Sequence, residues 1–404
     1  MLDVWPALPL AIWCDRIGGV DDRIGGVDNI IAALERRERV CQIVLANGNV
    51  QSSNWEIVFE ALQQPLPELT ILFLWSKGET VPVVPDSFLG GSAAPCLEFL
   101  QLYGIPFPGL PKLLLSATRL VTLHLINVPH SGYISPDTMV TVLSTLTSLY
   151  SLTLEFESPR SCPDQASRHP PPSTRSVLPI LTGVSFKGVT EYLEDLVACI
   201  DAPRLNNLRI TFFNDIAFDT PQLIQFVART AISGEPIKAY IVLMDVTARI
   251  RSLFPASLPW ELTVTISCRG LGWQLSSLEQ VCTSCLPLLS TEDLYIYEGQ
   301  RSPPDWKDDI ENGLWLQLLN PFTAVKNLYL SEKFALRIGP ALQELVEGRT
   351  TEVFPALQNI FLEGFESSGP VQEGIAKFVA ARQVASRTIE VSSWANSEMD
   401  KRYY

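Results

Sequence analysis

The chain has 404 residues, a formal net charge of −14 at pH 7, 47% hydrophobic residues and 18% charged residues. This composition excludes an intrinsically disordered chain, which combines low hydrophobicity with high net charge. The acidic balance argues against general nucleic-acid binding, leaves room for a local basic patch, and fits solubility and basic partners. The length fits two or three domains or, equally, one array of repeats.

Residues 1–38 are predicted to form a short helical N-terminal cap. Met1–Trp13 is apolar but carries Asp3 and no basic segment, so we expect no secretion signal there. An exposed end of a repeat array needs a cap to stay soluble. We therefore expect three apolar side chains of this segment to be buried: Trp5, Leu8 and Trp13.

A pattern of the form L-x-x-L-x-L, with aliphatic or aromatic substitutes, recurs along the chain. The matching segments are Val40–Leu45, Leu69–Leu74, Leu97–Leu102, Leu120–Leu125, Leu149–Leu154, Leu181–Phe186, Leu205–Ile210, Val325–Leu330 and Leu357–Leu362, with a partial match at Leu294–Ile296. Outside one irregular stretch, successive segments are 23 to 34 residues apart. Leucine-rich repeats run about 20–29 residues, and repeats at the long end carry a helix on the convex side. Helices are predicted between the strands at Trp55–Gln63, Thr138–Leu146 and Glu191–Ile200.

This alternation predicts an α/β fold, a leucine-rich-repeat solenoid with a curved parallel sheet and convex helices. With one strand per repeat we expect about ten to twelve strands. A doubly wound α/β domain also alternates strands and helices, but its strands are near-continuous apolar runs. Polar residues inside the repeated segments favour a sheet with one open face. The repeat domain is predicted to span residues 39–404.

Two stretches depart from the repeat. Residues 157–177 are rich in Pro, Ser and Arg, which predicts an exposed insertion. Residues 218–289 are irregular, with strand-like Ala239–Met244 and Leu262–Cys268 that we interpret as degenerate repeats. The sequence contains no uncharged apolar run of the length that a transmembrane helix needs.

Residues that could carry chemistry are few. Cys282 and Cys285 form a CxxC pair, but zinc would need a second pair or histidines, and the three histidines lie far upstream. The eight cysteines are interpreted as buried thiols of a reducing compartment. Catalysis through the CxxC pair or His124 is the least favoured hypothesis. We predict no enzyme, no catalytic or metal-binding residues and no cofactor.

Geometry assigns the candidate binding face. In L-x-x-L-x-L the leucines point to the core and the intervening residues point to the open side of the sheet. Exposed aromatic residues are enriched at binding hot spots, so we expect a partner surface that includes Trp75 and Tyr103. The alternative is that insertions bury some of these side chains. The candidate residues are Phe73, Trp75, Tyr103, His124, Tyr295, Tyr297, Tyr329 and Phe361.

Segments along the whole chain resemble the large basidiomycete-fungal group of F-box-like proteins with leucine-rich repeats. The segments include VWPALPLAIW, IIAALERRERVCQI, PLPELTILFLW, PHSGYISPDTMVTVLSTLTSLYSLTLEFESPRS, YLEDLVACIDAPRLNNLRITFFN, TAVKNLYLSE and FPALQNIFLEG. The resemblance implies a non-catalytic protein-interaction scaffold that recognises substrates for an SCF-type ubiquitin ligase. It also implies a cytoplasmic or nuclear location and protein targets, with no nucleic-acid or membrane partner.

The resemblance lacks one expected part. The family carries an F-box ahead of this region, whereas this sequence begins at MLDVWPALPL, where the linker after the box would lie. Leu8-Pro9 alone does not make an F-box, because Asp15, Gly18 and Gly19 interrupt what should be its helices. We expect binding to a cullin-ligase adaptor only if an F-box is restored upstream. The alternative is a free-standing leucine-rich-repeat binding or inhibitor protein that has lost the box.

Overall fold

The structure is a computed structural model of the 404-residue chain. It describes residues 8–14, 27–47, 52–77, 81–91, 94–161, 174–213, 220–230, 236–254, 260–284, 290–299, 303, 310–345, 352–364, 370–385 and 387–394. The chain divides into two compact units. The N-terminal unit comprises Met1–Asn207 and Gln225–Ala231, and the C-terminal unit comprises Leu208–Ile224 and Ile232–Tyr404.

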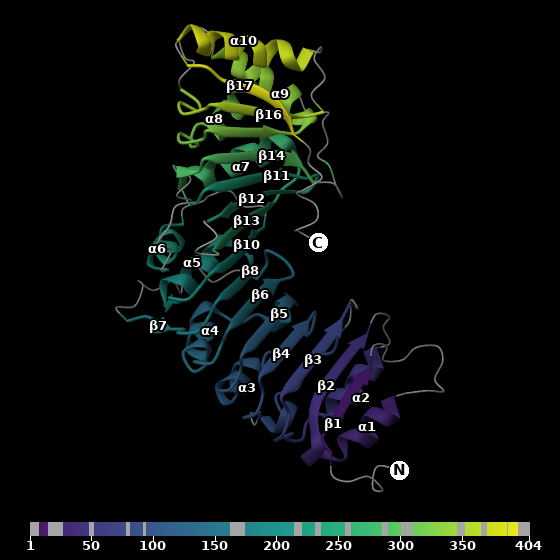
Figure 1. The fold of residues 1–404 in the computed structure, drawn as a ribbon. Helices are drawn as coiled ribbons and strands as arrows, with labels where there is room; N and C mark the ends of the chain where they lie inside the picture. The colour runs from purple at the N-terminus through teal and green to yellow at the C-terminus, as the bar shows by residue number, and fades with distance from the viewer. Residues whose placement is uncertain are drawn as a thin grey trace. The chain divides into compact units, whose positions relative to one another are not determined.

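The N-terminal unit is built on parallel strands that follow one another side by side (Figure 1). Their hydrogen-bonded order is β1-β2-β3-β4-β5-β6-β8, and the short strands β7 and β9 form a separate parallel pair. The strands are β1 (Leu10–Cys14), β2 (Val40–Asn47), β3 (Ile71–Ser76), β4 (Phe99–Tyr103), β5 (Thr122–Val128), β6 (Ser151–Phe156), β7 (Ser176–Val177), β8 (Gly183–Gly188) and β9 (Ile200–Asp201).

Helices alternate with these strands, as predicted. They are α1 (Val27–Leu34), α2 (Ser52–Ala61), α3 (Leu110–Ser116), α4 (Pro136–Leu143), α5 (Thr190–Ala198) and α6 (Pro221–Arg229), whose residues divide between the two units. Single turns of 3₁₀ helix occur at Arg37–Arg39 and His130–Gly132, whereas Phe88–Gly91 is a tight turn in which Leu89 and Gly90 have positive φ. The start of α4 shows why a helix begins there. The Ser135 hydroxyl accepts a hydrogen bond from the Thr138 backbone N–H, and Pro136 fills the first helical position.

The C-terminal unit combines parallel and antiparallel pairing. Its strand order is β10-β13-β12-β11-β14-β15-β16-β17, with β11-β12-β13 antiparallel and β11-β14-β15-β16-β17 parallel. The strands are β10 (Asn207–Phe212), β11 (Lys238–Leu243), β12 (Thr247–Leu253), β13 (Glu261–Ser267), β14 (Asp293–Glu298), β15 (Asn327–Leu330), β16 (Asn359–Glu363) and β17 (Glu390–Trp394). The helices are α7 (Leu271–Ser284), α8 (Asn312–Leu319), α9 (Glu332–Glu344) and α10 (Pro370–Val384).

The strands bury one face and leave the other open. Along β3, β4 and β6 buried and partly exposed residues alternate, and the central leucines Leu72, Leu100 and Leu152 are at most 1% exposed. Helices cover the leucine side: α5 packs on β8, α7 on β12 and β13, and α9 on β14, β15 and β16. We call the other side, which carries the intervening residues of each repeat, the open face. The predicted α/β leucine-rich-repeat solenoid is thereby confirmed.

Four details differ from the sequence prediction. The irregular stretch contains the expected strands as β11 and β13, but β12 pairs with both in an antiparallel arrangement that a simple repeat does not contain. Residues 1–38 include a strand, β1, as well as helix α1. The main β-sheet contains more strands than the ten to twelve expected. The expected burial of Leu8 and Trp13 is wrong: Leu8, just ahead of β1, is 57% exposed, and Trp13 is 74% exposed on β1, which is the edge strand among the strands that the structure describes. Trp5 lies outside the described residues.

The Pro/Ser-rich insertion is described only at its ends. Residues 157–161 follow β6, residues 174–177 lead through β7, and residues 162–173 lie outside the described part of the chain. The domain boundaries at 1–38 and 39–404 stay predictions.

Candidate functional site

The open face carries all eight candidate residues, in two groups on separate units. Phe73 and Trp75 lie on β3, Tyr103 on β4 and His124 on β5. The four candidates of the C-terminal unit are Tyr295, Tyr297, Tyr329 and Phe361, on β14, β15 and β16.

In the N-terminal unit the candidate residues occupy two neighbouring rows of the sheet. Trp75 lies opposite Tyr103, and their ring centroids are 5.6 Å apart at an interplanar angle of 35°. Phe73 lies opposite Gln101, and Gln101 lies opposite His124. Parallel in-register pairing thus brings Trp75 and Tyr103 together as one aromatic pair, whereas an amide side chain separates Phe73 from the imidazole.

His124 is held among neutral groups. Its Nδ1 lies 3.4 Å from Gln101 Oε1, and its Nε2 lies 3.4 Å from Ser151 Oγ. Its ring also meets the Phe99 ring edge to face at 5.9 Å. Burial lowers the pKa of the imidazole, so it is neutral at pH 7. A serine–histidine pair needs a third group that orients the imidazole and stabilises its cation, and here a neutral amide stands in that place.

In the C-terminal unit three of the four candidate rings form a continuous stack. Tyr295 and Tyr329 stack with centroids 4.1 Å apart at 11°, and Tyr329 and Phe361 stack at 4.4 Å and 7°. Tyr240 on β11, which the sequence pattern did not single out, extends the stack with its ring 4.7 Å from that of Tyr295 at 14°. These separations are close to the spacing of neighbouring strands, about 4.7–4.9 Å, because the four residues occupy one register position. We call Tyr240, Tyr295, Tyr329 and Phe361 the tyrosine ladder.

Stacking decides what the ladder presents to a partner. The ring faces cover one another, so the edges and phenol groups lie toward the open side. Tyr240 and Tyr295 are only 5% and 7% exposed, whereas Tyr329 and Phe361 are partly exposed. Burial raises the pKa of Tyr295 and of Tyr329, so both phenols stay neutral and keep their hydrogen-bonding protons at pH 7.

Trp394, a second residue that the sequence pattern missed, lies across the ladder. Its ring meets Tyr295 at 6.0 Å and Tyr329 at 5.7 Å, both edge to face. Its Nε1 donates a hydrogen bond of 3.0 Å to the Leu330 carbonyl oxygen on β15. The last strand therefore fixes an indole against the middle of the ladder. Tyr297 lies one open-face position further along β14, opposite Val242.

A row of polar side chains borders the ladder on its other side. Lys238 Nζ lies 3.5 Å from Asp293 Oδ2, and Asn327 Nδ2 donates to Asp293 Oδ1 at 2.7 Å. Asn359 Nδ2 continues the row by donating to Asn327 Oδ1 at 2.7 Å. Side-chain amides that bond from strand to strand fix the register of the rings beside them.

Of the six cysteines that the structure describes, two are buried, as predicted, and four are partly exposed. Cys282 is buried on α7, and Cys285 lies outside the described residues. Burial raises the pKa of the Cys268 thiol to about 11, which keeps it protonated. The described part of the chain contains no group of His, Cys, Asp and Glu side chains that could hold a metal ion. None of its helices has the length and apolar character needed to span a bilayer.

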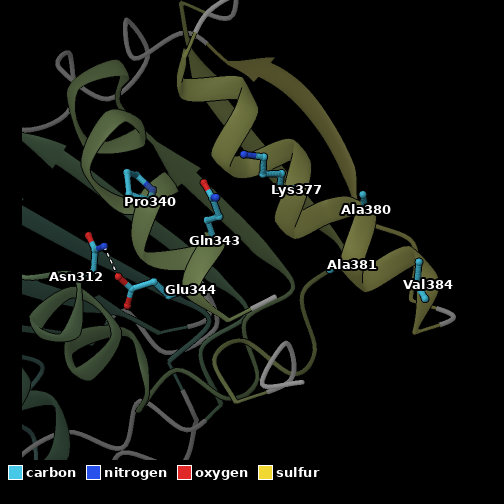
Figure 2. A pocket seen from close by; sticks show the side chains of 8 residues that line it. All are labelled: Asn312, Pro340, Gln343, Glu344, Lys377, Ala380, Ala381 and Val384. Carbon is cyan, nitrogen blue, oxygen red and sulfur yellow. Dashed lines mark hydrogen bonds between the residues drawn. The ribbon is translucent and has the colours of Figure 1, made fainter. Parts of the chain in front are cut away.

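A cavity lies away from the open face, among the helices of the C-terminal unit (Figure 2). It has a volume of about 820 Å³ and lies between α8, α9 and α10. Asn312 donates a hydrogen bond to Glu344 at its rim, and Val384 is 89% exposed. None of the eight candidate residues lines it.

Comparison with known proteins adds little. No family model and no curated protein matches the chain. Among solved structures, the leucine-rich repeat-containing protein LegL7 from Legionella pneumophila is 12% identical, with 90% of this chain and 96% of that chain covered and a TM-score of 0.32. The assignment of repeats therefore rests on the strand register and the buried leucine positions of this chain.

Proposed function

We propose that this protein is a non-catalytic interaction scaffold that binds a protein partner through its open face. The tyrosine ladder carries the proposal: its stacked rings form one rigid row across four strands, and Tyr329 and Phe361 in that row are partly exposed. Tyrosine and tryptophan side chains of this kind dominate binding energy at protein interfaces. A surface that needed only solubility would not repeat aromatic residues at one register position.

The finer proposal is that the partner is a substrate of an SCF-type ubiquitin ligase, with this chain as the recognition part. It is supported by the resemblance to F-box-like leucine-rich-repeat proteins alone. The two possibilities, ligase receptor and free-standing binding or inhibitor protein, share the open face and differ in whether a cullin-ligase adaptor is recovered with the complex.

Site-specific photo-crosslinking tests the shared proposal. A photoreactive phenylalanine at Phe361 should capture a discrete partner from cells, and Tyr329→Ala in the same chain should reduce that capture. The matched control places the same group at Trp273 on α7, which is 63% exposed. Equal capture of the same protein from both positions, or capture that Tyr329→Ala leaves unchanged, would contradict the proposal.

A further inference from the structure

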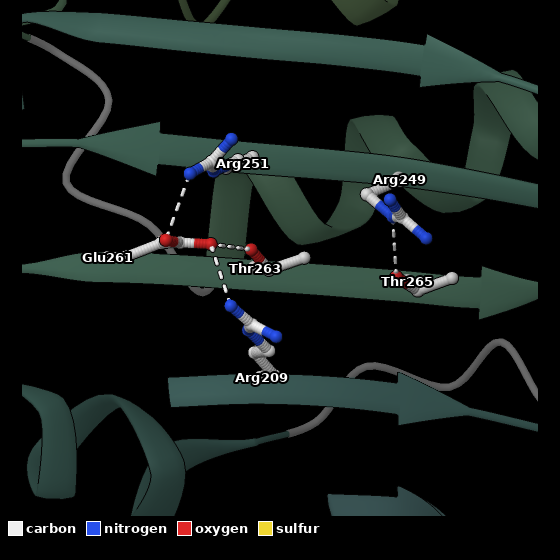
Figure 3. Close-up of polar contacts among 6 residues, drawn as sticks. All are labelled: Arg209, Arg249, Arg251, Glu261, Thr263 and Thr265. Carbon is white, nitrogen blue, oxygen red and sulfur yellow. Dashed lines mark hydrogen bonds and ion pairs between the residues drawn. The ribbon is translucent and has the colours of Figure 1, made fainter. Parts of the chain in front are cut away.

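The open face of the C-terminal unit carries a basic group in a chain that is acidic overall. The six residues lie on β10, β12 and β13, and Figure 3 shows their polar contacts. We call them the arginine patch: Arg209, Arg249, Arg251, Glu261, Thr263 and Thr265.

One carboxylate organises half of the patch. Arg251 Nη2 donates to Glu261 Oε2 at 2.9 Å, and Arg209 Nη2 lies 4.0 Å from Glu261 Oε1. The Thr263 hydroxyl donates to the same carboxylate at 3.2 Å. The Arg251 and Glu261 side chains are each 19% exposed, so this pair is a fixed part of the surface, whereas the Arg209 side chain is 60% exposed.

Arg249 has a different environment. Its Nε donates to the Thr265 hydroxyl at 3.3 Å, which orients the guanidinium, and the residue is exposed. Within the described part of the chain, no carboxylate lies at ion-pair distance from Arg249. The patch thus contains three arginines and one glutamate, so it has a positive charge that Glu261 does not balance.

The patch is continuous with the tyrosine ladder. Arg251 lies opposite Tyr240, the first ring of the ladder, and Arg249 lies opposite Val242. Arg249 and Arg251 are two residues apart on one strand, so their side chains leave the sheet about 6.6 Å apart. An extended peptide repeats its side chains on one face at the same interval.

We infer that the arginine patch receives an acidic peptide segment, with Asp or Glu side chains, from the protein that the tyrosine ladder binds. This inference rests on the proposed function and names the chemistry of its partner. Guanidinium groups bind carboxylates through paired, charge-assisted hydrogen bonds, and local charge complementarity fixes register and accelerates association. A nucleic-acid backbone is bound through a longer row of cations than the three arginines of this patch.

The test uses the full chain and a fluorescein-labelled octapeptide of glutamate, with an octapeptide of lysine as the opposite charge. Anisotropy titrations at low ionic strength should show binding of the glutamate peptide and none of the lysine peptide. Arg249→Glu should weaken binding at least about tenfold, and Arg209→Glu with Arg249→Glu should abolish it. Raising the salt to about 0.5 M should weaken binding by the wild-type chain, because exposed charges are screened.

Lys112→Glu on α3 is the matched control, since it makes the same change of charge at an exposed helix position. It should leave the affinity within about twofold of the wild type, because Lys112 is not one of the residues of the arginine patch. Arg249→Gln provides a neutral variant, and an unchanged melting temperature for both Arg249 variants shows that the fold is intact.

Three results would overturn the inference: failure of the wild-type chain to bind the glutamate peptide at low salt, equal binding by Arg249→Glu, or equally tight binding of an oligothymidylate. None of these three results would contradict the proposed function. If the partner captured at Phe361 is retained by Arg249→Glu and lost by Tyr329→Ala, the open face binds protein without an acidic anchor. If capture fails for the wild-type chain while the glutamate peptide still binds, the proposed function fails and the patch binds acidic peptides by itself.

Discussion

The open faces of the two units are built by the same repeat and differ in what they repeat. In the N-terminal unit the row through Phe73 continues with Gln101, His124 and Thr153, so each strand contributes a different chemistry. In the C-terminal unit the corresponding row carries an aromatic ring on each of four strands. Where in-register parallel strands repeat an aromatic residue, the rings stack. Where the residue varies from strand to strand, the row combines different side chains.

The antiparallel strand β12 adds a second difference. It places Arg249 and Arg251 beside the ladder, at a point where a regular repeat would return to the helix side. The irregular stretch therefore supplies Arg249, Arg251 and the first ring of the ladder, and the regular repeats supply the other three rings. Both units have a core of buried leucines, and their open faces differ. The predictions that follow test first the cores and then the open faces.

The largest expected effect concerns the shared core. Leu123→Ala in the N-terminal unit and Leu328→Ala in the C-terminal unit should each lower the free energy of unfolding by about 2–5 kcal/mol. Both side chains are fully buried, so each substitution removes apolar contacts and leaves a cavity. Urea denaturation measures both. A cost below about 1 kcal/mol at one site would show that the repeat core is not built in the same way in the two units.

The second effect distinguishes the units. Tyr295→Ala should cost about 2–4 kcal/mol, because the ring is stacked on both faces and buried. Trp75→Ala should cost about 1 kcal/mol or less, since Trp75 is partly exposed and its described ring contact is Tyr103. The same urea series compares them. Equal costs would mean that the ladder adds nothing to the stability of its unit.

Much of this contrast could be read from the sequence. The L-x-x-L-x-L spacing identified Tyr295, Tyr329 and Phe361 as open-face positions, and the structure places all three there. The period-2 alternation of strands fixes such assignments once the buried leucines are recognised. The helices at Trp55–Gln63, Thr138–Leu146 and Glu191–Ile200 are confirmed by α2, α4 and α5, with ends that differ by a few residues.

The remainder depended on pairing that no local pattern specifies. Tyr240 belongs to the ladder because β11 pairs with β14 across an insertion, and the intervening β12 and β13 obscure that neighbour in the sequence. Trp394 reaches the ladder from the last strand, 64 residues beyond the carbonyl that it binds. Burial at Trp13 was predicted wrongly because an apolar segment can also become an edge strand with an exposed ring.

The third prediction uses alkaline pH. Burial raises the pKa of Tyr295 and Tyr329 above the unfolded value of about 10, so the neutral phenols favour the folded state. Their contribution is complete below pH about 10 and is lost as the pH rises above it. Stability of the chain should therefore fall above pH about 10. Tyr295→Phe should make that fall shallower than it is in the wild-type chain.

Thermal melts between pH 8 and pH 11, with absorbance at 295 nm to follow phenolate formation, measure this effect. If Tyr295→Phe and the wild-type chain lost stability with the same slope, the phenol of Tyr295 would ionise as easily in the folded chain as in the unfolded chain. That result would contradict the closed stack from which the ladder is defined.

The smallest expected effect concerns His124, on the open face of the N-terminal unit. His124→Ala should change stability at pH 7 by less than about 0.5 kcal/mol, because the imidazole lies on the open face and has only long contacts to neutral groups.

Burial lowers the pKa of His124, so the neutral imidazole favours the folded state. This contribution is complete above the unfolded pKa of about 6.5 and is lost as the pH falls through the lower pKa of the folded state. His124→Ala should therefore flatten a small loss of stability on the acid side, and an NMR titration of the ring protons should give a pKa below 6.5. A pKa above that value would require a carboxylate partner that the described contacts of His124 do not include. A cost for His124→Ala equal to that of Leu123→Ala would place the imidazole in the core and shift the register of β5 by one residue, which would exchange its open and buried faces.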